Sequence, residues 1–251
     1  EIKGPLVLED RADLKPGPGE VVVRVKAAAL NRRDFWITQG MYPGIKPPVV
    51  LGSDGAGVVA SCGEGVSSTW EGRDVIIDPG IEWGDRQAAH STSYSILGVP
   101  ADGTFASQVV VKESQLHEKP AHLDWIEAAG LPLAGLTAYR AVFSQAQLTS
   151  DETILITGIG GGVATFALLF AVAAGADVWV TSSSSGKIQR AVELGAKGGF
   201  DYRDEDWATQ LAERPDLKSA PNVIIDSAGG PGYSQLVEVA GQGARIVSYG
   251  A

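Results

Sequence analysis

A glycine-rich run, Gly158-Ile159-Gly160-Gly161-Gly162-Val163-Ala164, separates a predicted strand, TILIT, from a long apolar helix. A turn of this kind lets the backbone approach a pyrophosphate, whose negative charge the first N–H groups of the helix stabilise. Because the glycines lie between a strand and a helix, the run predicts dinucleotide binding rather than a purely structural turn. The residues expected to bind the cofactor here are Gly158, Gly160, Gly161, Gly162 and Val163.

The next predicted strand carries the signal that separates NADPH from NADH. An NADH site places Asp or Glu at the end of this strand, where it binds the ribose 2′-hydroxyl. Here the strand ends in TSSSSGK, and the nearest acid, Asp177, precedes the strand. Hydroxyls and a lysine donate to a 2′-phosphate, which a carboxylate would repel. The sequence therefore favours NADPH over NADH, and the alternative is a solvated serine loop with an ordinary surface lysine. The predicted phosphate ligands are Ser182, Ser183, Lys187 and Tyr202, with Arg203 beside them.

The elements that position these residues alternate between strand and helix from Glu152 onward. Five apolar strands, TILITG, VWVTSS, GGFDY, NVIIDSAG and ARIVSYGA, are separated by four helical stretches. This order predicts a doubly wound parallel sheet of the Rossmann kind, covered on both faces. A complete fold of this kind has about six strands, so we expect the C-terminal part to be missing. Further cofactor contacts are expected at the carboxyl ends of the last two strands, at Ser227, Ser248, Tyr249 and Gly250.

The first half of the chain has a different pattern of predicted secondary structure. Short strands such as VVVRVKAAAL and GAGVVASC are separated by glycine and proline, and PPVVLG begins another extended stretch. This pattern predicts a rolled antiparallel or mixed β domain. The segment DWIEAAGLPLAGLTAYRAVFSQAQL predicts a buried linking helix that is interrupted at Pro132. We place the β-rich domain at residues 1–124 and the dinucleotide-binding domain at residues 125–251, with its sixth strand absent.

Composition excludes several classes of protein. The formal net charge of −10 and the lack of a basic stripe argue against a nucleic-acid partner. The longest apolar stretch, Val163 to Ala176, is too short to span a bilayer, so no membrane association is expected. One cysteine, Cys62, excludes an intrachain disulfide and is compatible with a cytoplasmic location.

Several motifs in register resemble the medium-chain dehydrogenase/reductase superfamily, in particular its zinc-free quinone oxidoreductase branch. They are GPGEVVVRVKAAALNRRD, PVVLGSDGAGVV, AAGLPLAGLTAY, GIGGGVA, LGAKGGFDYR and GARIVSYGA, and they cover nearly all of the chain. The resemblance implies a GroES-like catalytic domain followed by a Rossmann domain. It also implies a homodimer or homotetramer of the complete protein.

The resemblance also implies that no metal is bound. Zinc-dependent members hold the catalytic ion with a Cys, the His of a Gly-His-Glu triplet and a later Cys, and the matching positions here are Asn31, Ser53 and Leu133. None of these is a usual zinc ligand. The region that matches the family's structural zinc lobe, DPGIEWGDRQAAHSTSYSILG, has no cysteine. The spacing of Cys62 and the three histidines fits no other ligand motif.

The resemblance places four candidate catalytic residues, Asn31, Asp34, Tyr42 and Ser53. Asn31 and Asp34 would order the substrate and the nicotinamide end, although Asp34 is equally suited to cap the local turn or to pair with Arg32 or Arg33. Tyr42 is a candidate donor to the substrate oxygen or a packing residue, and Ser53 offers a hydroxyl in place of histidine. Thr137 is expected to contact the nicotinamide or its ribose phosphate, with packing as the alternative.

The reaction favoured by these residues is hydride transfer from NADPH to a small carbonyl-bearing acceptor. Without a Lewis acid, oxidation of simple alcohols loses its main activator, whereas a quinone or an α,β-unsaturated carbonyl already accepts hydride. An enoyl-thioester reductase is an alternative enzyme. A non-catalytic NADPH-binding scaffold or sensor is an alternative of another class.

Overall fold

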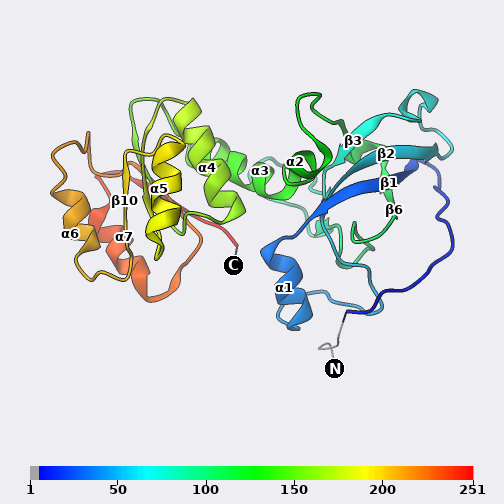
Figure 1. Ribbon diagram of the computed structural model, residues 1–251, viewed down its shortest axis with the longest axis horizontal. Coiled ribbons are helices and arrows are strands. Elements are labelled where there is room, and N and C mark those ends of the chain that lie inside the picture. The colour runs from blue at the N-terminus through cyan, green and yellow to red at the C-terminus, as the bar shows by residue number, and fades with distance from the viewer. Residues whose placement is uncertain (1–5, 251) are drawn as a thin grey trace. The chain divides into compact units, whose positions relative to one another are not determined.

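The computed structural model describes residues 6–250 and divides the chain into two compact units. The first unit ends at Leu133 and the second begins at Ala134, whereas the sequence suggested a boundary between residues 124 and 125. In Figure 1 the first unit runs from blue to green and the second from green to red. No helix in the described range is both long and apolar enough to cross a bilayer.

The first unit is built on an antiparallel sheet with the strand order β6-β1-β2-β3-β7 (Figure 1). Alternating apolar side chains of these strands, such as Val21, Val23, Val75 and Ile77, form one buried core. This confirms the predicted β-rich domain. The strands are β1 (Glu20–Ala29), β2 (Asp54–Cys62), β3 (Asp74–Ile77), β6 (Gln108–Lys112) and β7 (Leu116–Glu118), and a separate pair is β4 (Gly80–Ile81) with β5 (Ser95–Ile96).

Short helical segments connect the strands of this unit. The helix α1 (Arg32–Thr38) follows β1 directly, and α2 (Trp125–Ala129) packs Ala128 and Ala129 against Ala56 of β2. Single 3₁₀ turns lie at η1 (Ser68–Trp70) and η2 (Glu113–Gln115).

The extended stretch expected after Pro47 is a loop, not a strand of the sheet. Its backbone pairs with another loop instead: Gly103 N donates to the Val50 carbonyl at 2.8 Å, and Phe105 N donates to the Leu51 carbonyl at 2.9 Å. Gly52 has φ of +98°, and a β-carbon there would lie 2.5 Å from the Phe105 ring. Only glycine therefore fits at the bend that turns Ser53 into the interior.

The second unit is a five-stranded parallel sheet with the order β10-β9-β8-β11-β12. All five strands that the sequence predicted are present. They are β8 (Thr153–Ile156), β9 (Asp177–Thr181), β10 (Gly198–Phe200), β11 (Val223–Asp226) and β12 (Arg245–Ser248). The strands β9 and β10 lie on one side of β8, and the strands β11 and β12 lie on its other side. The strand order therefore reverses between β8 and β11. In folds of this kind ligands bind at the carboxyl ends of the strands at that point.

Helices cover both faces of this sheet, as the apolar strands predicted. Ile154 and Ile156 face one core, and Leu155 between them faces the other together with Trp179. The four covering helices are α4 (Gly162–Ala173), α5 (Ser185–Glu193), α6 (Trp207–Ala212) and α7 (Tyr233–Val239), with a 3₁₀ turn η4 (Gly230–Gly232) before α7.

The segment expected to be one interrupted, buried helix is three shorter pieces. After α2, the helix α3 (Pro132–Tyr139) begins at Pro132, a residue favoured in the first turn because its missing N–H is not needed there. It continues into η3 (Arg140–Gln145), a π-helical turn. The expected burial holds for one face only: Ala134 and Ala138 are buried, whereas Leu136 and Tyr139 are about half exposed, at 47% and 52%.

Candidate active site

The glycine loop of the second unit has the backbone that phosphate binding requires. Gly158 and Gly160 have φ of +65° and +102°, and α4 begins immediately afterwards at Gly162. The N-cap residue, Gly161, provides no side-chain cap, so the first N–H groups of α4 remain available to an anion. A β-carbon on Gly160 would lie 2.6 Å from Cδ of Lys187. The loop thus forms a cradle of backbone atoms, and a side chain at Gly160 would occupy space within it.

A buried polar pair ties the two strands at the sheet's reversal point. Thr157 Oγ1 donates to Asp226 Oδ1 at 2.7 Å, and Gly229 N donates to Asp226 Oδ2 at 2.9 Å. Ser227 N donates back to Thr157 Oγ1 at 3.2 Å. Sequence reasoning missed both Thr157 and Asp226. The sequence did contain a signal for them. Each is a polar residue at the carboxyl end of an apolar strand, where the cofactor is expected to bind.

The predicted 2′-phosphate residues lie on one edge of the sheet. Ser182 is buried and Ser183 half-buried just after β9, and Lys187 lies on the first turns of α5. Arg203 is not an unengaged cation, because its Nε donates to Asp201 Oδ1 at 3.0 Å. Its Nη2 also donates to the carbonyl of Ser183 at 2.8 Å, which joins the ends of β9 and β10.

The remaining predicted cofactor residues divide into two groups. Tyr249 and Ser227 are brought together: their side chains are hydrogen-bonded, and Tyr249 N donates to the Asp226 carbonyl at 3.0 Å. Burial raises the pKa of the Tyr249 hydroxyl, and the bond with Ser227 opposes that shift. The others differ in how far they are buried: Thr137 is half-buried on α3, Val163 is half-buried on α4, and Tyr202, Ser248 and Gly250 are exposed.

The first unit buries a cluster of charged and polar groups at the start of α1. Arg33, Asp34, Ser53 and Asp54 are each at most 7% exposed. Asn31 connects the two carboxylates: its backbone N donates to Asp34 Oδ2 at 2.7 Å, and its Nδ2 donates to Asp54 Oδ2 at 2.9 Å. The fold thereby joins Asn31, Asp34 and Asp54 in one hydrogen-bonded network.

Asp54, which sequence reasoning did not single out, lies at the centre of this network. Its Oδ1 accepts the backbone N–H of Leu133 at 2.8 Å, in the first turn of α3. Burial raises its pKa from 3.8 to about 6, and the hydrogen bond from Asn31 opposes that shift. Burial likewise raises the pKa of Asp34, whose Oδ1 has no hydrogen-bond partner among the described residues. The sequence signal that was missed for Asp54 is its position after Gly52-Ser53, where zinc-dependent members of the family have Glu.

Arg33 is the second residue that sequence reasoning left out of the site. The sequence allowed for it only as an ion-pair partner of Asp34, yet in the described chain it forms no ion pair. Its Nη1 donates to Ser53 Oγ and, at 2.8 Å, to the Leu97 carbonyl. Its Nε donates to Tyr42 Oη at 3.3 Å, and its guanidinium carbon lies 4.7 Å from the centre of the Tyr42 ring. Asp34 instead holds the Asn31 turn, as the capping alternative predicted.

The positions that hold zinc in zinc-dependent relatives have no ligand set here. Asn31 presents an amide N–H₂ to Asp54, Ser53 Oγ is bonded to a guanidinium, and Leu133 contributes a backbone N–H. Within residues 6–250 no group of three or more His, Cys, Asp or Glu side chains could hold a metal ion. In the segment after β3, Trp83 packs on Tyr94 and His90, with ring centres 4.9 and 5.8 Å apart.

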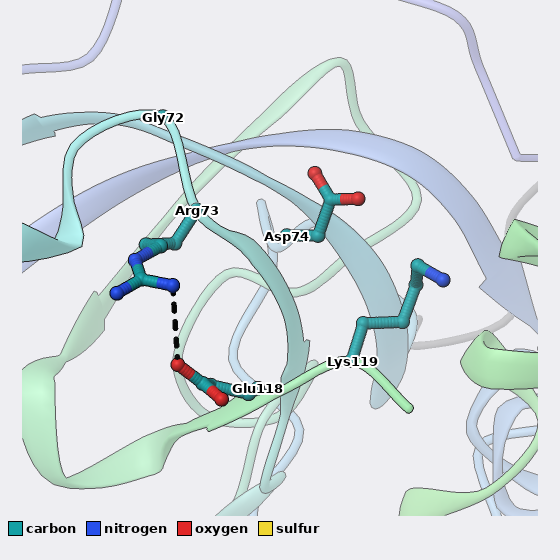
Figure 2. A pocket seen from close by; sticks show the side chains of 5 residues that line it. All are labelled: Gly72, Arg73, Asp74, Glu118 and Lys119. Carbon is teal, nitrogen blue, oxygen red and sulfur yellow. Dashed lines mark ion pairs between the residues drawn. The ribbon is translucent and has the colours of Figure 1, made fainter. Parts of the chain in front are cut away.

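A surface hollow of about 260 Å³ in the first unit contains none of these residues. It is lined by Gly72, Arg73, Asp74, Glu118 and Lys119, at the β3–β7 edge of the sheet. Figure 2 shows Arg73 facing Glu118, with which it forms an ion pair at 3.5 Å, whereas Lys119 points elsewhere. Lys119 Nζ donates to the Leu123 carbonyl at 2.7 Å. The cations of this hollow already have partners, so it offers no anion site.

Comparison with known proteins agrees with both halves of this description. The family model for the alcohol dehydrogenase GroES-like domain matches residues 17–121, and that for zinc-binding dehydrogenase matches residues 162–251. The chain is 39% identical to the zinc-type alcohol dehydrogenase-like protein YogA of Leptosphaeria maculans, over 98% of this chain and 72% of that protein. It is 34% identical to an acryloyl-coenzyme A reductase of Metallosphaera sedula and 33% identical to a quinone oxidoreductase of Pseudomonas aeruginosa. Those matches cover 95% and 98% of this chain, and 71% and 70% of the relatives.

A solved structure described as an NAD-dependent alcohol dehydrogenase superposes with a TM-score of 0.89 at 34% identity. The match covers 96% of this chain and 72% of that one. The fold and the site together define a nicotinamide-dependent oxidoreductase. The chain belongs to the medium-chain dehydrogenase/reductase superfamily.

Proposed function

We propose that the protein is a zinc-independent oxidoreductase that reduces a quinone or an α,β-unsaturated carbonyl compound with NADPH. The observation that carries this proposal is the buried guanidinium of Arg33 bonded to Ser53, where zinc-dependent relatives have a histidine ligand. A guanidinium repels a second cation, and Ser53 Oγ uses its own hydrogen on the Leu97 carbonyl. The donor chemistry of this position therefore suits an enzyme that works without the metal.

The cofactor half of the proposal rests on the second unit. The backbone of Gly158–Gly162 would hold the pyrophosphate, and Ser182, Ser183 and Lys187 would hold the 2′-phosphate. One acid after β10, Asp201, is paired with Arg203 and would thus repel a phosphate less than an unpaired carboxylate would. Because the similar alcohol dehydrogenase is described as NAD-dependent, the cofactor preference must be measured for this chain.

The residues of the first unit suit reduction better than alcohol oxidation. NADPH, when bound, would supply a hydride, and the solvent would supply the accompanying proton, so that a quinone would become a hydroquinone and an enone a saturated ketone. Oxidation of a simple alcohol requires loss of its hydroxyl proton, which zinc promotes in metal-dependent enzymes. An electron-poor acceptor requires only hydrogen-bond donors at the oxygen on which negative charge develops. Tyr42, half-buried beside Arg33, is such a donor.

The test is an acceptor panel on the purified protein, with NADPH consumption followed by its absorbance. We expect turnover with quinones and enones, no oxidation of simple alcohols with NADP⁺, and no loss of rate after treatment with a zinc chelator. A stoichiometric zinc ion whose removal abolishes turnover would contradict zinc independence. Tight NADPH binding without reduction of any acceptor would instead indicate the scaffold or sensor alternative.

An enoyl-thioester reductase is the second candidate, favoured by the similarity to an acryloyl-coenzyme A reductase. The same panel distinguishes it when 2-enoyl thioesters are included. A kcat/KM for the thioester far above that for the corresponding quinone or simple enone would select this alternative. The dimer or tetramer of the complete protein and its cytoplasmic location stay predictions.

A further inference from the structure

We propose that Arg33 is the positioning residue of the acceptor site, where it fixes the Tyr42 hydroxyl as the hydrogen-bond donor to the acceptor oxygen. This inference rests on the proposed function and names a role for a residue that neither the sequence motifs nor the relatives assign. Its starting point is a buried cation that forms no ion pair. Arg33 is 7% exposed, and none of the ion pairs in the described chain includes it.

A buried charge outside an ion pair is costly, and a carboxylate that could form one is adjacent in the sequence. Asp34 is the next residue and is also buried, with its Oδ1 unpartnered among the described residues. The two side chains are nevertheless held apart: Asp34 turns back to the Asn31 backbone, whereas Arg33 turns to Tyr42 and Ser53. A purely structural arginine would gain most from pairing with Asp34. The observed arrangement instead places its N–H groups on neutral oxygens, among them the Tyr42 hydroxyl, and the nearby carboxylates act on it only through space.

The hydrogen bonds of Arg33 determine where the Tyr42 proton can point. Tyr42 Oη accepts from Arg33 Nε, so its own hydrogen is directed away from the guanidinium. In the described part of the chain that hydrogen has no acceptor, and the Tyr42 side chain is only half-buried. The ring is also held from its face, 4.7 Å from the guanidinium carbon. Tyr42 is therefore a fixed donor with one unused hydrogen.

Ser53 has a different role from the one expected of it. Its Oγ accepts from Arg33 Nη1 and donates to the Leu97 carbonyl at 2.9 Å, and the residue is fully buried. It has no hydrogen left for a substrate. Together with Leu97 it anchors the far side of the guanidinium, and the two N–H groups of Nη2 find no acceptor within residues 6–250. The guanidinium is hydrogen-bonded to the Tyr42 hydroxyl, so its positive charge would favour negative charge on an oxygen that accepts the Tyr42 hydrogen bond.

This arrangement selects acceptors by chemical class. It favours compounds whose oxygen becomes anionic when hydride arrives at carbon, such as quinones, enones and enoyl thioesters. Removal of one oxyanion donor typically lowers kcat by about 100-fold to 1,000-fold. We expect Tyr42→Phe and Arg33→Met each to lower kcat by about 100-fold, with little change in the KM for NADPH. Arg33→Lys should restore part of the loss, since it returns the charge without the planar geometry.

The decisive experiment is the double variant. If Arg33 acts through Tyr42, Arg33→Met in the Tyr42→Phe background should lower kcat by less than about threefold, because both substitutions remove the same hydrogen bond to the acceptor. Losses that multiply would overturn the proposal. Arg32→Met is the matched control, since Arg32 is the neighbouring arginine but is exposed, and its guanidinium carbon lies 5.7 Å from the centre of the Trp36 ring. Circular dichroism and NADPH affinity of every variant identify any that fail to fold.

A second readout does not depend on turnover. 4-Nitrophenol reports its own ionisation by absorbance, and the wild type with NADP⁺ should bind the phenolate at least about tenfold more tightly than the phenol. Arg33→Met and Tyr42→Phe should each lose this preference, and Arg32→Met should keep it. Equal binding of both forms, or none, would overturn the inference. If the wild type reduces no acceptor but keeps the phenolate preference, the proposed function fails while the assignment of Arg33 and Tyr42 stands.

Discussion

The two units build their polar sites from different parts of the chain. In the second unit the cradle is backbone: two glycines with positive φ and the uncapped start of α4. In the first unit the site consists of buried side chains, with a guanidinium and two carboxylates, the latter joined through Asn31. A backbone site tolerates almost no side chain, and a side-chain site tolerates almost no change of charge. The two should therefore fail in different ways.

The largest effect is expected from a side chain in the backbone cradle. Gly160→Val places a β-branched residue at φ of +102°, where strain costs about 3 kcal/mol, and it also blocks the approach of a pyrophosphate. We expect NADPH affinity to fall by roughly 1,000-fold, measured by isothermal titration, since the phosphates lose their backbone donors. Gly186→Ala on α5 is the control, because a β-carbon there meets only Ser184 Oγ at 3.9 Å and should leave affinity unchanged. An unaffected Gly160→Val variant would show that the phosphates bind elsewhere.

A smaller effect, on stability, is expected from the charge of the side-chain site. The folded pKa of Asp54 lies at about 6, above the unfolded value of 3.8, so the folded state binds this proton more tightly. The group therefore destabilises the fold above pH 6, and the penalty of about 3 kcal/mol disappears as the pH falls from about 6 to about 4. Relative to Asp54→Asn, the wild type should gain about that much free energy of unfolding over this range.

Urea unfolding at several pH values between about 4 and about 8 measures this difference. Asp74→Asn changes an exposed carboxylate on the neighbouring strand and should follow the wild type across the range. A parallel pH dependence of Asp54→Asn and the wild type would mean that Asp54 does not titrate in the folded protein within that range.

The same contrast explains what the sequence could predict. The parallel sheet, its five strands and the glycine cradle were predictable because each depends on local pattern: apolar runs, helix spacing and glycines between them. The loop after Pro47 looked like a strand because its residues 49–51 are apolar, but the Val50 and Leu51 carbonyls accept from Gly103 and Phe105, far along the chain. Local pattern contains no information about such a partner.

The side-chain site was predictable only in part for the same reason. Asn31, Asp34, Tyr42 and Ser53 were predicted through motif resemblance, which marks positions and not orientations. Arg33 was interpreted as an ion-pair partner because Asp34 is adjacent in sequence, whereas the fold directs it to Leu97, far along the chain. Asp54 was passed over because its importance depends on burial and on Leu133. A buried charge acquires its function from contacts that only the folded chain supplies.

The smallest effect should separate NADPH from NADH at the edge of the backbone cradle. Lys187 is exposed on α5 with its aliphatic stem against Gly160, so its charge can reach a 2′-phosphate without holding the fold together. We expect Lys187→Ala to weaken NADPH binding about tenfold, the worth of one charge-assisted contact, and to leave NADH binding unchanged. Arg190→Ala, on the same helix but paired with Glu193 at 3.0 Å, is the matched control and should alter neither affinity. Equal losses of affinity for both cofactors would place Lys187 at the pyrophosphate. No loss of affinity for either would indicate that the serine segment is an ordinary solvated loop and Lys187 a surface cation.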